Sequence, residues 1–238
     1  MKIPKLKLSI ALFVVGASTL ALLVLAANHH EISAHKHQLA ESVGNVLKYG
    51  WTLFIIYFFA KVLRVTPVRE TVKLAKKITI PSILQNVLVL IAVVAISLCL
   101  YRWVPILNFS WLYLLPANTS SGGPTNIVMI PLQIRYVGIG FVLLFALCVP
   151  TLARREEIVY RLGTRNWRDG SIRSVKFGLA HCLMGVPLCV GVALCVSGLW
   201  YTLQYFRGGI ERSTLHHSIY NWIIVCGALV WTIVQVLH

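Results

Sequence analysis

The stretch ITIPSILQNVLVLIAVVAISLCLY, residues 78–101, decides in which solvent this chain folds. It contains no charged residue, and a helix needs about 20 mostly apolar residues to span a bilayer. Similar runs recur at residues 8–28, 136–153, 177–206 and 213–238, with a shorter one at 49–60 between two lysines. Since 58% of the residues are hydrophobic, we predict an all-α, polytopic transmembrane helix bundle of six to seven membrane helices.

Positive charge is concentrated in two stretches of the chain. Of a net charge of +15, six Lys and Arg lie in residues 61–77 and seven in residues 154–176, against one in 28–45 and two in 102–135. The positive-inside rule therefore places both basic stretches and the basic amino-terminal tail in the cytoplasm. Anionic lipids at the cytoplasmic face are the expected partners of this charge, and nucleic acid is not an expected partner.

The chain shows no internal repeat, so we expect one integral membrane domain over residues 1–238. Residues 1–101 would supply amino-terminal helices and a basic loop. The first apolar run is too long for the core of a signal peptide, so we expect a retained helix there. Unusual polar residues gather in the carboxyl half, residues 136–238.

The apolar run at residues 177–206 allows two interpretations. Its 30 residues are many for one span and few for two. Gly185, Pro187 and Gly191 in the segment MGVPLCVG, residues 184–191, can break a helix. We favour a broken or re-entrant hairpin, which returns the expected loop from Arg207 to Arg212 to the cytoplasmic side; one long tilted helix would place this loop outside.

Two adjacent glutamates stand in ARREEIVYR, residues 153–161, in a chain with only seven acidic residues. On a helix, Glu157 and Arg161 are four residues apart and face each other. Glu156 points about 100° away. One carboxylate can therefore be neutralised structurally while its neighbour stays free for another partner.

Two further pairs have helical spacing: Phe177 and His181 in FGLAH, and His217 and Asn221 in HSIYN, with His216 pointing elsewhere. Each pair alone is compatible with ordinary packing. In the hairpin topology, however, both pairs and the glutamates reach the same membrane depth, where ionisable groups are candidates for function. A carboxylate and a histidine can deprotonate water, and an amide and a second histidine can stabilise an oxyanion. We expect a hydrolytic site.

These motifs, E-E-x-x-x-R, F-x-x-x-H and H-x-x-x-N in this order, resemble those of the CPBP intramembrane proteases. That family includes the type II CAAX prenyl endopeptidase and bacterial proteins linked to bacteriocin processing and self-immunity. The resemblance covers about residues 153–225 and implies a multi-helix membrane fold with a glutamate-dependent site that faces the cytosol.

The resemblance also implies roles for individual residues. By this match Glu156 would be the water-activating base, His181 its partner, and His217 with Asn221 the oxyanion donors, with Glu157, Arg161 and Phe177 supporting. It implies no cofactor, with zinc as the alternative. Family members lead into the glutamates with apolar residues, whereas Arg154 and Arg155 stand here. An arginine paired with Glu156 would weaken it as a base.

We therefore predict an intramembrane endopeptidase, a hydrolase that cleaves a membrane-associated protein or peptide near the cytoplasmic face by glutamate-activated water. The expected location is the bacterial inner membrane. One alternative is a non-catalytic immunity or scaffold protein of the same fold. Another is a transporter with a proton relay, which needs polar groups across the bilayer; few exist here.

Overall fold

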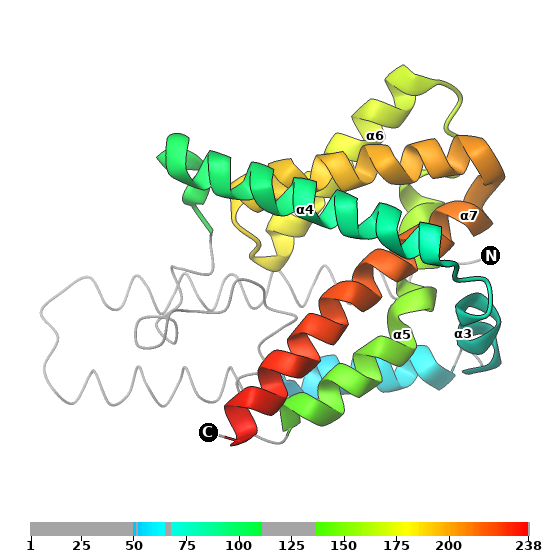
Figure 1. The fold of residues 1–238 in the computed structure, drawn as a ribbon, viewed down its shortest axis with the longest axis vertical. Coiled ribbons are helices and arrows are strands. Elements are labelled where there is room, and N and C mark those ends of the chain that lie inside the picture. Colours follow the sequence, from blue (N-terminus) through cyan, green and yellow to red (C-terminus); the bar gives the residue numbers. More distant parts are fainter. Residues whose placement is uncertain (1–49, 51, 65–67, 111–136, 238) are drawn as a thin grey trace, which may run out of the picture.

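The computed structural model of the protein describes residues 50, 52–64, 68–110 and 137–237. All regular secondary structure in these ranges is helical, which confirms the predicted all-α class for this part of the chain (Figure 1). The first apolar run, residues 8–28, lies outside the described residues.

Among the described residues, three helices are long and apolar enough to cross a membrane. They are α4 (Ile80–Trp103), α5 (Val137–Tyr160) and most of α7 (Leu188–Leu237). Residues 52–64 form a shorter helix. A membrane protein with several spans is thereby supported at the level of length and composition.

The beginning of α4 is fixed by a capping box. The hydroxyl of Thr79 accepts a hydrogen bond from the Ser82 amide, and the Ser82 hydroxyl accepts one from the Thr79 amide. Pro81 fits this first turn because its missing N–H would have no partner inside the helix. The apolar segment thus starts directly after the basic residues Lys76 and Lys77.

Helix α7 consists of two arms, residues 188–207 and 210–237, which meet at a kink (Figure 1). Gly209 has a φ of 67°, in the left-handed region that favours glycine. The expected loop between Arg207 and Arg212 is therefore reduced to this two-glycine kink. Helix α7 packs against α4, α5 and α6 and is the centre of the described fold.

The apolar run at residues 177–206 is broken, so the alternative of one long tilted helix is wrong. Helix α6 (Trp167–Ala180) is followed by the short 3-10 helix η5 (His181–Met184) and by Gly185, whose φ is 86°. The chain then folds back. The Ser174 hydroxyl on α6 lies 3.1 Å from that of Thr202 on the first arm of α7. Helix α6 and that arm form a hairpin that turns at the predicted segment, but its first helix begins at Trp167, so only residues 177–180 of that helix belong to the apolar run.

The two basic stretches are mostly helical, contrary to the expected loops. The first contains α3 (Val68–Ala75), and the second contains the end of α5 and the beginning of α6. At α6, the Asn166 side chain accepts a hydrogen bond of 2.9 Å from the Asp169 amide. Charged residues are tolerated on exposed helix faces, so charge density marks a change of environment and not a helix end.

Candidate functional site

The candidate site lies where α5, α6 with η5, and the second arm of α7 converge. Helix α5 supplies Glu156 and Glu157, the end of α6 supplies Phe177, and the second arm of α7 supplies His217. His181 begins η5, directly after α6. Each of the three motifs thus contributes at least one residue to this region, through Glu156 and Glu157, Phe177, and His217.

Glu157 is the centre of a buried polar network. Its side chain is fully buried, and its Oε1 lies 2.8 Å from Nδ1 of His217. The hydroxyl of Ser213 donates to Oε2, and the guanidinium of Arg161 lies 3.8 Å from the same oxygen. A carboxylate buried without such partners would be strongly unfavourable, so this network is what allows Glu157 to be charged inside the bundle.

Arg161 ties the end of α5 to the hairpin. It is fully buried, donates a hydrogen bond of 3.1 Å to the carbonyl oxygen of Gly198, and lies 5.0 Å from the centre of the Phe177 ring. A guanidinium over an aromatic face is a favourable cation–π contact. The predicted pairing of Arg161 with Glu157 is therefore present, and it also holds Phe177.

His217 is held in one orientation by two aromatic rings. Tyr201 stacks on it at 4.4 Å with an interplanar angle of 14°, and Phe177 meets it edge-on at 5.5 Å. Because a carboxylate only accepts hydrogen bonds, Nδ1 carries the proton that binds Glu157. The opposite nitrogen, Nε2, lies 3.6 Å from Oε2 of Glu156. The two glutamates thus face the two nitrogens of one imidazole.

Glu156 differs from its neighbour in accessibility. Its side chain is 38% exposed, and the 3.6 Å gap to His217 is longer than a direct hydrogen bond. Arg154 and Arg155 are exposed, and in the described residues neither forms an ion pair with Glu156. Residues one or two apart on a helix do not face each other. Glu156 is therefore open to a further partner, as a catalytic base must be.

His181 also contacts Phe177. Their rings meet edge-on at 4.8 Å, and Nδ1 of His181 lies 2.8 Å from the Phe177 carbonyl oxygen. Since a carbonyl can only accept, Nδ1 carries a proton, and Nε2 of the neutral ring is an acceptor with no hydrogen bond to another described residue. Phe177 therefore contacts both of the histidines predicted for the site.

Asn221 is the predicted site residue with the fewest contacts. It is half-buried, one turn after His217 on the same helix, and makes no hydrogen bond within the described ranges. Two participants were not identified from the sequence. Ser213 is four residues before His217, a spacing that could have indicated it, whereas Tyr201 carried no such signal.

The described part of the chain holds no group of three His, Cys, Asp or Glu residues arranged to bind a metal ion. The zinc alternative therefore has no ligand set among these residues. Comparison of the chain with protein-family models, with curated proteins and with solved structures finds no match.

Proposed function

We propose that the protein is an intramembrane endopeptidase of the CPBP type, with Glu156 as the base that activates water. One observation carries this proposal. Two adjacent carboxylates lie at different nitrogens of one histidine ring. The buried Glu157 lies 2.8 Å from Nδ1 of His217, and the more accessible Glu156 lies 3.6 Å from Nε2. Packing alone does not require an accessible acid at Nε2.

The proposed reaction begins with water held between Glu156 and Nε2 of His181. Glu156 takes a proton as the water oxygen attacks the carbonyl carbon of a peptide bond. The oxyanion that forms accepts hydrogen bonds from Nε2–H of His217 and from the Asn221 amide. Glu156 then gives its proton to the leaving amine as the C–N bond breaks.

Glu157 has a supporting role in this proposal. Its carboxylate, 2.8 Å from Nδ1, orients the ring and stabilises the imidazolium form, in which Nε2 also carries a proton. Arg161 and Ser213 hold Glu157 in place from the other side. In this proposal Glu157 positions His217 as a hydrogen-bond donor, whereas Glu156 accepts the proton of the water.

The proposal includes a topology of six to seven spans in the bacterial inner membrane, with the site toward the cytoplasm. The location of the basic residues supports this orientation: Arg154 and Arg155 precede the two glutamates, and Arg207 and Arg212 flank the kink before His217. The substrate would be a membrane-associated protein or peptide. Anionic lipids would contact the same face.

The test is cleavage of a quenched-peptide library and of a membrane proteome by the purified protein and its variants. Wild type is expected to cleave with and without a chelator, Glu156→Gln to be inactive, and Glu211→Gln, a matched change at an exposed acid outside the site, to be active. Loss of activity with chelator would indicate a metal enzyme. Absence of cleavage, with biological function intact in Glu156→Gln, would indicate a non-catalytic immunity or scaffold protein.

A further inference from the structure

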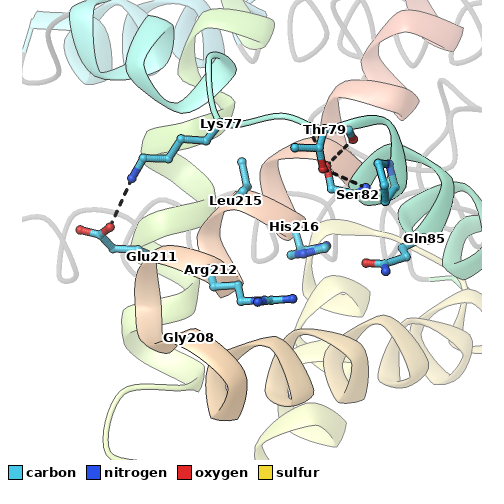
Figure 2. A pocket seen from close by; sticks show the side chains of 10 residues that line it. Lys77, Thr79, Ser82, Gln85, Gly208, Glu211, Arg212, Leu215 and His216 are labelled. Carbon is cyan, nitrogen blue, oxygen red and sulfur yellow. Dashed lines mark hydrogen bonds and ion pairs between the residues drawn. The ribbon is translucent and has the colours of Figure 1, made fainter.

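A cavity of about 420 Å³, with charged and polar side chains as part of its lining, lies where the beginning of α4 meets the kink of α7 (Figure 2). It is separate from the candidate site: His216 lines the cavity, whereas its neighbour His217 bonds Glu157. Arg212, also in the lining, directly precedes Ser213 of the buried network. The second arm of α7 thus contributes Arg212 and His216 to the cavity and Ser213 and His217 to the candidate site.

Arg212 is the main charged group of the cavity. Its Nε donates a hydrogen bond of 2.8 Å to Oε1 of Gln204, a fully buried residue on the first arm of α7. This bond orients the guanidinium, and neither terminal nitrogen has a hydrogen-bond partner in the part of the chain that the structure describes. Figure 2 shows the side chain reaching below His216, with Gln85 beyond its end.

His216 adds a second donor of fixed orientation. It is only 3% exposed, and its Nδ1 lies 3.0 Å from the Asn86 amide nitrogen. That nitrogen also donates to the Ser82 carbonyl oxygen at 2.7 Å, so it must be the amide –NH₂. Nδ1 therefore accepts, and the proton of the neutral ring is on Nε2. The structure gives Nε2 no partner within the described residues.

The cavity carries one uncompensated positive charge. Lys77 and Glu211 form an ion pair of 3.4 Å and balance each other (Figure 2), whereas the partner of Arg212 among the described residues is the neutral Gln204. A guanidinium fork, a histidine N–H and the amide of Gln85 suit a ligand with several acceptor oxygens and one negative charge. Phosphate groups fit this description and bind arginine in a bidentate manner.

We propose that this cavity binds the phosphate group of an anion, with the terminal nitrogens of Arg212 and Nε2 of His216 as donors. Its position favours the headgroup of an anionic phospholipid. The apolar part of α4 begins at this level, and Ile80 and Leu84 are 74% and 58% exposed, which leaves apolar surface for acyl chains beside the cavity.

The test is calorimetric titration of the purified full chain in an uncharged, phosphate-free detergent. The probes are dihexanoyl phosphatidylglycerol, dihexanoylglycerol, which lacks the phosphate, and inorganic phosphate. We expect phosphatidylglycerol to bind, and Arg212→Gln to raise its Kd about tenfold or more, as for loss of a charge-assisted hydrogen bond. Arg212→Lys should recover part of the affinity. Arg207→Gln, a matched change at an exposed arginine outside the lining, should change Kd less than about threefold.

The outcomes separate the sources of the phosphate. Arg212-dependent binding of phosphatidylglycerol without competition by inorganic phosphate supports a lipid site. Arg212-dependent binding of inorganic phosphate alone supports the phosphate site and assigns it to a soluble compound. The proposal is overturned if dihexanoylglycerol binds as well as phosphatidylglycerol, if neither anion binds, or if Arg207→Gln weakens binding as much as Arg212→Gln. If Arg212→Gln fails to fold, the comparison of phosphatidylglycerol with dihexanoylglycerol on the wild-type protein still tests the proposal.

Discussion

Replacement by glutamine should lower the stability of the protein strongly at Glu157 and only slightly at Glu156, although the two glutamates are adjacent on α5. Glu157→Gln removes the carboxylate that lies 3.8 Å from the guanidinium of Arg161, the one ion-pair partner that Arg161 has among the described residues, where both side chains are fully buried. Breaking a buried pair by removing one partner costs about 3–5 kcal/mol because it leaves an uncompensated charge. The amide can still accept from Ser213 and His217, so the lower part of this range is expected.

Glu156→Gln should have little effect on stability. Its side chain is 38% exposed and lies 3.6 Å from His217, and exposed ion pairs contribute about 0–1 kcal/mol. The free energy of unfolding of both variants and wild type would be measured in mixed micelles by titration with a denaturing detergent. Circular dichroism follows the loss of helix.

A double-mutant cycle provides the control. Arg161→Met removes the guanidinium, so Glu157→Gln in that background should cost much less than in wild type, with a coupling energy of about 0.5–3 kcal/mol. The reasoning is refuted if Glu156→Gln destabilises as much as Glu157→Gln. It is also refuted if Glu157→Gln costs less than about 1 kcal/mol in the wild-type background.

Three further predictions concern the helices that hold the site. Gly209→Ala should destabilise the protein by about 1–2 kcal/mol in the same unfolding assay, because its φ of 67° is left-handed, whereas Gly227→Ala, in open space, should have little effect. Gly178→Ala should destabilise by about 1–3 kcal/mol, since a Cβ there would lie 2.5 Å from a backbone oxygen of the facing helix; unchanged stability would mean that α6 and α7 can separate freely. The hydrogen bond from Arg173 lowers the pKa of Asp169, so its contribution is present above the unfolded pKa of about 3.9 and is lost as pH falls through the lower folded value. The difference in unfolding midpoint between wild type and Asp169→Asn should therefore shrink from pH 7 to pH 3, and a constant difference would contradict this.

Helical spacing predicted much of the candidate site. The four-residue separation of Glu157 and Arg161 indicated their pairing, and Gly185 with Pro187 indicated the break that follows His181 and η5. Both signals are local, since a helix face and a helix break depend on only a few neighbouring residues. The meeting of His217 with the glutamates followed only after the topology was assumed.

Features that depend on packing between distant helices were not predictable in this way. Nothing in the order of Glu156 and Glu157 indicates that each faces a different nitrogen of His217, because that depends on the rotation of α5 relative to α7. Tyr201 stacks on His217 from the other arm of α7, across a kink that the sequence suggested only as a loop. The basic stretches were interpreted as loops, which is wrong for most of their residues. Charged residues mark the membrane interface, but they do not end a helix.

Glu156 as the base in hydrolysis is the central claim, and the most direct measurement is single-turnover cleavage in H₂¹⁸O of any peptide identified in the library. Wild type is predicted to release a product with one solvent oxygen in its new carboxyl terminus. Glu156→Gln should slow this step about 100- to 10,000-fold, the range for loss of a general base, with its helix content unchanged. Equal rates for wild type and a folded Glu156→Gln would contradict the claim.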